Sequence, residues 1–291
     1  MPDIQWFPGH MARTGRELAE SVRLADIVVE VLDARIPRSS ANPGFDRIFA
    51  GRRRLIVLNK SDLADPARSG QWQKYYRGLG ADAVFVNSKR GDGADKIISL
   101  LKTAGDEKIR AQAARGVLNR PVRAIIAGIP NSGKSSLINR LVSKPAAKTG
   151  DKPGVTKKRQ WIRLGPGIEL LDTPGVLWPK FEDAETALHL AFTGAIRDEV
   201  YDAADAAEKL LRSLRKDYMR LVVLRYGDIY DETRPDNGAG PYALLERTGM
   251  RRGFIMKGGV VDIDRTAAIV LDEFRAAKIG RITLETPKYT Y

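Results

Sequence analysis

The chain has 291 residues, 43% hydrophobic and 29% charged, a composition typical of a globular protein with a substantial core. It has no cysteine and only two histidines, which excludes disulfides, thiol nucleophiles and cysteine-based zinc sites and argues against a histidine-rich metal site. The net charge of +13 predicts a polyanionic partner, and the surplus lies in residues 1–180, with 32 basic and 17 acidic residues against 17 and 19 in residues 181–291.

Hydrophobic patterns predict alternating helices and strands in the first part of the chain. An amphipathic helix is expected over residues 11–24, and further helices over residues 71–80 and 94–116. Apolar runs predict buried parallel strands at residues 27–32, 55–58, 83–86 and 122–127. Segments 160–164 and 168–171 flank a Gly-Pro-Gly turn and predict an antiparallel hairpin, so we expect an α/β fold with a mostly parallel six-stranded sheet.

The pattern becomes mostly helical from Asp183 onward, with a break over residues 234–241 that is rich in proline and glycine. We therefore expect two domains, residues 1–180 and residues 181–291, of which the second is small and all-α.

Residues 128–135 read GIPNSGKS and predict a phosphate-binding loop, since a strand precedes them and a helix follows. Backbone N–H groups of such a loop cradle phosphates, while Lys134 reaches the β and γ phosphates and Ser135 ligates Mg²⁺. The residues expected to contact the phosphates are Pro130, Asn131, Ser132, Gly133, Lys134, Ser135 and Ser136.

Residues 59–62 read NKSD and follow the strand at 55–58, at the edge of the sheet where open α/β folds bind ligands. The carboxylate of Asp62 accepts hydrogen bonds only, so it suits the paired N–H donors of guanine, a pair that adenine lacks. A polar helix cap is the alternative for so short a motif. A second base-contacting loop after the next strand favours guanine, and the expected contacts are Asn59, Lys60, Asp62, Asn87, Ser88 and Lys89.

Residues 172–175 read DTPG and predict a loop that senses the γ phosphate. Asp172 is expected to hold Mg²⁺ through water, and the N–H of Gly175 to meet the γ phosphate. Between this loop and the phosphate-binding loop, Thr156 follows Gly-Val and is the natural second hydroxyl for Mg²⁺, although such a tripeptide is usually an ordinary loop.

The guanine motif precedes the phosphate loop, which is the reverse of the order in familiar small GTPases and indicates a circular permutation. Three further segments, WFPGHM at 6–11, DARIP at 33–37 and FIMKGG at 254–259, complete a pattern that covers essentially the whole chain. The chain resembles the circularly permuted GTPases that assist ribosome assembly. This resemblance implies a role in late maturation of the large ribosomal subunit, with a helical C-terminal domain that contacts rRNA.

Two basic clusters in the second half are candidates for that RNA contact. The first is expected to share one helix face and comprises Lys209, Arg212, Lys216 and Arg220. The second lies in a glycine-containing stretch and comprises Arg251, Arg252 and Lys257. A solvated helix face balanced by nearby acids is the alternative of equal weight, and residues 52–54 and 157–159 offer further basic surface.

The group that orients the attacking water is not evident, because Val176 occupies the position where many GTPases have glutamine. The candidate catalytic residues are Lys134, Gly175 and His10. For His10, a structural role or an rRNA contact is the alternative. Asn131 resembles the asparagine of potassium-activated GTPases and suggests a K⁺ ion as an added positive charge.

We expect a Mg²⁺-dependent GTP hydrolase that binds GTP and GDP and assists assembly of the large ribosomal subunit. The alternatives are a tRNA-modifying or translation GTPase, and a GTP-dependent RNA-binding module with negligible turnover. No apolar run approaches the roughly 20 residues that span a bilayer, and residues 1–6 lack signal-peptide features, so a cytoplasmic location without membrane contact is expected.

Overall fold

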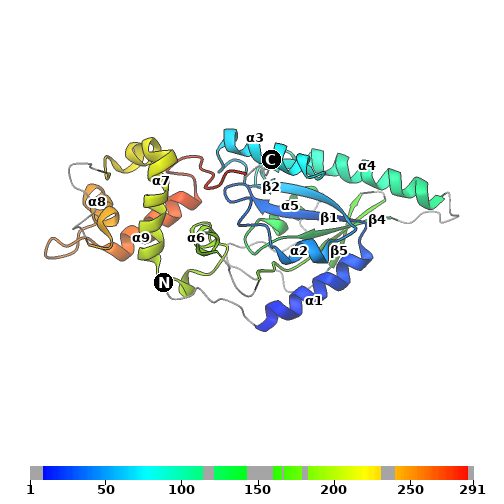
Figure 1. Cartoon of the computed structure of the whole chain (residues 1–291), viewed down its shortest axis with the longest axis horizontal. Coiled ribbons are helices and arrows are strands. Elements are labelled where there is room, and N and C mark those ends of the chain that lie inside the picture. The colour runs from blue at the N-terminus through cyan, green and yellow to red at the C-terminus, as the bar shows by residue number, and fades with distance from the viewer. Residues whose placement is uncertain are drawn as a thin grey trace.

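The protein consists of a sheet region and a helical region that lie side by side along the long axis of the molecule (Figure 1). The structure is a computed structural model and describes residues 9–113, 121–142, 160–165, 167–178, 183–230 and 240–287. Among these residues, no helix is both long and apolar enough to cross a membrane.

Six strands form one sheet in the order β3-β2-β1-β4-β6-β5. All neighbours are parallel except β5 and β6, which pair as an antiparallel hairpin. This arrangement confirms the predicted sheet, whose strands are β1 (Ile27–Asp33), β2 (Arg53–Asn59), β3 (Asp82–Val86), β4 (Val122–Ala127), β5 (Gln160–Gly165) and β6 (Ile168–Asp172).

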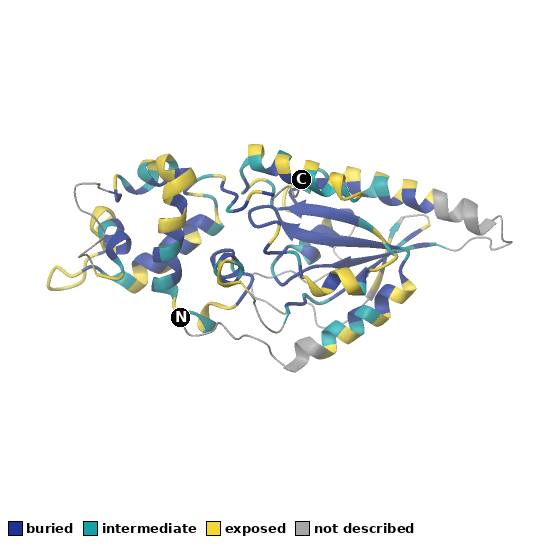
Figure 2. Ribbon diagram, in the orientation of Figure 1, coloured by how far each residue is buried: buried dark blue, intermediate teal, exposed yellow. Residues whose placement is uncertain are grey.

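Helices cover both faces of the sheet, whose strands are buried along most of their length (Figure 2). Val29 and Val31 of β1 face α4 (Ala94–Ala113) and α5 (Lys134–Leu141), whereas Val28 faces α1 (Gly9–Leu24) and α2 (Gly44–Ile48). Leu32 packs on the latter side with α3 (Pro66–Gly78). This alternation is the period-two pattern of a strand buried on both faces.

The helical region has its own apolar core. It consists of α6 (Ala184–Phe192), a short 3₁₀ turn (Asp198–Val200), α7 (Ala203–Tyr226), α8 (Ala243–Arg252) and α9 (Ile263–Arg275). Phe192, Leu214 and Phe274 are among the residues packed inside it. Three helices begin at aspartates that accept a backbone N–H and so satisfy the first turn, namely Asp183, Asp202 and Asp262.

Two features lie outside the predictions from sequence. Helix α2 is only five residues long and has no side-chain cap, so it leaves little periodic signal. After α9 the chain is not helical: residues 276–287 run back from the helical region to the sheet region beside α3, drawn in red in Figure 1. The expected domain boundary at residue 180 and most of the expected break at 234–241 lie outside the described residues.

Candidate functional site

The predicted nucleotide motifs all follow strands at one edge of the sheet. Because β1, β2, β3, β4 and β6 are mutually parallel, their carboxyl ends lie together, and so do the loops that follow them. Motifs separated by more than a hundred residues in the chain therefore meet in space, in the manner that a permuted chain requires.

Asn59, the last residue of β2, joins three of these loops. Its Nδ2 donates to the carbonyl of Ser132 in the phosphate loop at 2.8 Å. Its Oδ1 accepts from both the hydroxyl of Ser88 at 2.6 Å and the backbone N–H of Ser88 at 3.2 Å. Gly133 allows this approach, since a Cβ there would lie 2.2 Å from Nδ2 of Asn59. The side chain thus binds loops rather than solvent, and it is 1% exposed.

The phosphate loop lies between β4 and α5, as its sequence predicts. Gly128 has a φ of 155°, and a Cβ there would lie 2.5 Å from the carbonyl oxygen of Val31. The Nζ of Lys134 donates to the loop carbonyls of Gly128 at 3.1 Å and Ile129 at 2.7 Å, so the ammonium is already held inside the loop. Burial lowers the pKa of Lys134 to about 8, although the charge of Asp172 opposes this shift.

The loop after β6 lies against the phosphate loop. The N–H of Val176 donates to the carbonyl of Gly128 at 3.2 Å, and a Cβ on Gly175 would lie 2.6 Å from the nitrogen of Pro130. Only glycine therefore fits at position 175. Val176 itself is 5% exposed and packs with Leu18 in the core beneath α1 and α2, so its side chain leaves the site.

Ser135 and Asp172 supply the donor types that Mg²⁺ prefers. One is a hydroxyl in the first turn of α5 and the other a carboxylate, 4% exposed, at the end of β6. Hard oxygen ligands of this kind fit Mg²⁺ held mainly by nucleotide phosphates and water. No group of three or more acidic or histidine residues that would bind a metal by itself occurs in the described part of the chain. Thr156 lies outside the described residues.

The buried carboxylate of Asp33 pairs with Lys60, the second residue of the guanine motif. The Nζ of Lys60 lies 2.9 Å from Oδ2 of Asp33, and Nη2 of Arg35 lies 2.7 Å from the same atom. Burial alone would raise the pKa of Asp33, but the two cations hold it well below its usual range. Lys60 has a φ of 58°, a left-handed conformation rare for residues other than glycine. The ion pair thus connects the guanine motif to the end of β1.

Asp62 projects from this motif. Its side chain is exposed, and no hydrogen bond or ion pair involves it within the described ranges. Asn87, in contrast, is buried, and its Oδ1 accepts from the N–H groups of Lys89 at 3.0 Å and Arg90 at 3.1 Å. Of the residues expected to contact the base, Asn87 thus shapes its own loop, while Asp62 and the exposed Lys89 face outward.

The structure does not describe the side chain of His10, and the candidates for RNA contact lie in the helical region. The backbone of His10 lies in the first turn of α1, but its side chain is outside the description. In α7, Lys209 pairs with Asp205 at 2.7 Å and Arg212 with Glu208 at 2.8 Å, which favours the solvated-face interpretation for these two. The other candidates for RNA contact are exposed, and they are Lys216, Arg220, Arg251, Arg252 and Lys257.

One contact at the site has no signal in the sequence. Asn131, with a φ of 56°, donates from its Nδ2 to the carbonyl of Gly194 in the helical region at 2.6 Å. The phosphate loop is therefore bonded directly to the loop after α6. Nothing in the pattern around Gly194 indicated this, because a backbone carbonyl acceptor leaves no trace in sequence.

The fold and the site together define a circularly permuted P-loop GTPase. A family model described as 50S ribosome-binding GTPase matches residues 123–224. Similar proteins include ribosome biogenesis GTPase A of Priestia megaterium, 47% identical over 98% of this chain and 97% of the relative, and that of Bacillus cereus, 45% identical over 98% and 94%. The chain belongs to the ribosome biogenesis GTPase A family.

A solved structure of YlqF from T. maritima in its GNP-bound form has a TM-score of 0.66 and 26% identity, covering 95% of this chain and 99% of that chain. A GDP-bound structure of the same protein matches at the same TM-score. This family membership makes the protein a GTP hydrolase and confirms that it binds guanine nucleotides.

We predict that Asp62→Asn changes the preferred base. The substitution replaces one acceptor by a donor, so GTP affinity should fall by about tenfold or more, whereas a xanthosine nucleotide, which presents a carbonyl there, should bind more tightly. Equilibrium titration with both nucleotides measures this. Equal affinity of the unsubstituted protein for ATP and GTP would refute the guanine assignment.

We also predict that nucleotide affinity falls above pH 8 through Lys134. Phosphate binding favours the charged amine, whose pKa in the unliganded protein is about 8, so affinity should be nearly constant well below that pH and decline as the pH rises through it. Between pH 7 and pH 8.5 the loss through this group should be about fourfold. Lys134→Met is the control, since ionisation of the base affects both proteins. Parallel pH profiles would contradict the role of Lys134.

Proposed function

We propose that the protein is a GTP-hydrolysing assembly factor for late maturation of the large ribosomal subunit. The observation that carries this proposal is similarity over 98% of the chain to proteins named ribosome biogenesis GTPase A, together with a domain model described as 50S ribosome-binding. The basic surplus of residues 1–180 supports a partner rich in phosphate. The names of the relatives favour this function over a tRNA-modifying or translation GTPase.

Sedimentation with purified ribosomal particles tests the partner. The protein should travel with large subunits or their precursors, and not with tRNA or small subunits, when a non-hydrolysable GTP analogue is present. Large subunits should also raise GTP turnover. Binding without any turnover would support the alternative of a GTP-dependent RNA-binding module.

The chemistry proposed for hydrolysis divides among three groups. Lys134 neutralises charge on the β and γ phosphates, the N–H of Gly175 meets the γ phosphate, and Ser135 with Asp172 holds Mg²⁺, which supplies further positive charge. Since the side chain of Val176 is buried away from the site, another group must orient the attacking water. We assign this role to His10, with a K⁺ ion near Asn131 as an added charge.

Replacement of His10 by alanine should lower subunit-stimulated turnover by about 10²-fold or more while GTP affinity stays intact. Turnover of the unsubstituted protein should be higher in K⁺ than in Na⁺ buffer at equal ionic strength. Single-turnover rates in the two buffers measure both effects. An unchanged rate for His10→Ala would remove that residue from the mechanism, and equal rates in the two salts would remove the K⁺ ion.

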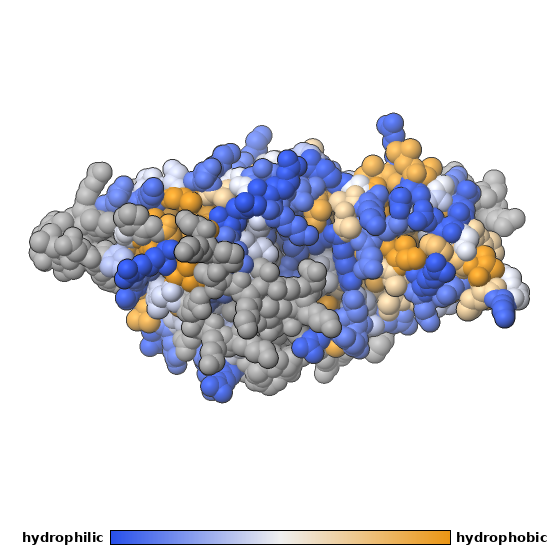
Figure 3. Space-filling view, turned by 180° about the vertical axis from the view of Figure 1, so that it is seen from behind, coloured by the Kyte–Doolittle hydropathy of each residue, from blue (hydrophilic) through white to orange (hydrophobic). Residues whose placement is uncertain are grey.

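The surface proposed for rRNA lies on the helical region, where hydrophobic side chains are interspersed with hydrophilic ones (Figure 3). At the turn between α8 and α9, Ile255, Met256 and Val260 are 44%, 50% and 61% exposed. Arg251 and Lys257 beside them are exposed as well. Basic groups around exposed apolar side chains suit RNA, because they meet phosphates and unstacked bases respectively.

The chain passes directly from the γ-phosphate loop toward the helical region, which supports a nucleotide-dependent switch. Leu177 packs with Ile129 of the phosphate loop and with Leu190 of α6 in one apolar cluster. A loop ordered by the γ phosphate can therefore move the helical region. Because two linked contacts bind far more tightly than either alone, the angle between the regions sets the affinity for rRNA.

We predict tight binding to the large subunit with a non-hydrolysable GTP analogue and weak binding with GDP, differing by about 10²-fold. A flexible Gly/Ser insert between Trp178 and Phe181 should abolish the difference, since it uncouples the loop from α6. Affinities are compared at one fixed salt concentration, because phosphate contacts depend on salt. Equal affinity in the two nucleotide states would refute the switch and leave GTP binding untouched.

A further inference from the structure

The segment after α9 inserts between two loops of the nucleotide site. Its residue Leu284 donates its N–H to the carbonyl of Arg35, in the loop after β1, at 2.8 Å. Ile282 donates to the carbonyl of Leu63, in the loop after β2, at 3.1 Å. The segment thus bonds to the loops on both sides, and in Figure 1 it runs in red along the carboxyl edge of the sheet.

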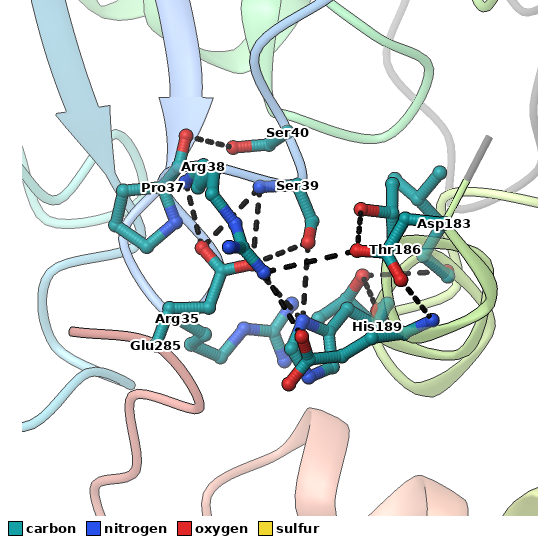
Figure 4. A network of polar contacts seen from close by, with 12 residues as sticks. Arg35, Pro37, Arg38, Ser39, Ser40, Asp183, Thr186, His189 and Glu285 are labelled. Carbon is teal, nitrogen blue, oxygen red and sulfur yellow. Dashed lines mark hydrogen bonds and ion pairs between the residues drawn. The ribbon is translucent and has the colours of Figure 1, made fainter. Parts of the chain in front are cut away.

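Glu285 anchors the far end of this segment. Its buried carboxylate accepts from the backbone N–H groups of Arg38 at 2.6 Å and Ser39 at 3.1 Å, and lies 2.9 Å from Nδ1 of His189 (Figure 4). Its carbonyl accepts from Nε1 of Trp72 at 3.1 Å. A carboxylate held by this many donors fixes the position of the chain on either side of it.

Arg281 reaches from this anchored segment to the guanine motif. Its Nη2 donates to the carbonyl of Ser61 at 2.9 Å, and its Nε donates to the carbonyl of Ala64 at 2.9 Å. The carbonyl of Ser61 belongs to the same peptide group as the N–H of Asp62. Arg281 therefore holds the backbone on both sides of the residue that would recognise the base.

Asp62 needs such external support. Its own side chain is exposed and has no hydrogen bond among the described residues, so the direction of its carboxylate depends on the backbone that carries it. On the sheet side, the N–H of Ser61 donates to the carbonyl of Val86 at 3.1 Å. On the opposite side, residues 61–65 are bonded by α7 and the C-terminal segment. Among the described residues, these two elements provide all the hydrogen bonds to residues 61–65 that come from outside the sheet region.

Thr283 completes the contact. Its hydroxyl accepts from the N–H of Asp65 at 3.1 Å and donates to the carbonyl of Ala34 at 3.2 Å, so one side chain bonds the loops after β1 and β2. Tyr218 of α7 donates to Oδ2 of Asp65 at 3.0 Å. The guanine loop is therefore supported by residues more than 150 positions later in the sequence.

We propose that Arg281, together with Ile282 and Thr283, positions the guanine motif, so that selectivity for guanine depends on the C-terminal segment. The segment does not touch the base. It holds the loop backbone so that the Asp62 carboxylate meets both N–H donors of guanine at once. This inference rests on the guanine contact proposed for Asp62.

The experiment compares GTP with ITP, whose base lacks the amino group that Asp62 would bind. The dissociation constant of ITP divided by that of GTP reports whether the Asp62 carboxylate is oriented to bind the amino group. A general loss of stability, in contrast, weakens the binding of both nucleotides alike and leaves this ratio unchanged. Arg281→Ala should lower this discrimination by about tenfold, because an unheld loop loses one of two cooperating hydrogen bonds. Lys278→Ala is the matched control, since it removes one exposed positive charge from the same segment and should leave the ratio unchanged.

Arg281→Lys provides a second variant, which keeps the charge and loses the fork that reaches two carbonyls. It should give an intermediate ratio, and it replaces Arg281→Ala in the comparison if that variant does not fold. A ratio equal to that of the unsubstituted protein in the folded variants overturns the inference. So does an equal fall in the Lys278→Ala control, which would make the effect one of charge alone.

Asp62→Asn in the same series separates this inference from the proposal beneath it. If Asp62→Asn leaves this ratio of dissociation constants unchanged, the guanine contact proposed for Asp62 is wrong. If Asp62→Asn lowers the ratio but Arg281→Ala does not, the guanine contact stands and the positioning role of the C-terminal segment is wrong.

Discussion

The hydrogen bonds of the Asn59 amide are the interaction on which the nucleotide site depends. One short side chain uses its donor on the phosphate loop and its acceptor on the loop after β3, so the base end and the phosphate end are fixed relative to each other. Both groups are buried, and replacing the amide would leave the partner carbonyl of Ser132 without its donor, which costs more than an exposed bond is worth. The requirement for glycine at position 133 follows from this same contact.

A second constraint is the buried charge at the end of β1. Asp33 is stable there as an anion because Arg35 and Lys60 both pair with it. Arg35 in turn donates to the carbonyl of Arg275, at the end of α9, at 3.3 Å. The charge cluster thus connects the guanine motif to the helical region through the segment that follows β1.

Sequence patterns predicted the sheet, the phosphate loop and the rotated motif order, because each depends on local periodicity or on a motif with strict spacing. They did not predict the contacts between the two regions. Asn131 and Gly194, or Arg281 and Ser61, meet through backbone carbonyls, which every residue possesses and which therefore leave no compositional signal. The paired state of Lys209 and Arg212 was one of the two alternatives open from the sequence, because an acidic residue precedes each of them by four positions.

The nucleotide site is contacted from outside the sheet region at two places, the guanine motif and the phosphate loop, and the two contacts have different consequences. The contact through Arg281 reaches the backbone of the guanine motif. In the proposed binding mode this motif meets the guanine base, which GTP and GDP share, so a change there would alter the affinity for both nucleotides by the same factor. The contact from Asn131 to Gly194 lies at the phosphate loop, the end at which the two nucleotides differ. Coupling between sites is reciprocal. A partner that acts only on the contact between Arg281 and the guanine motif therefore changes the affinity for GTP and GDP alike, and favours neither nucleotide state. Only a shift transmitted through the phosphate end can make that partner distinguish GTP from GDP.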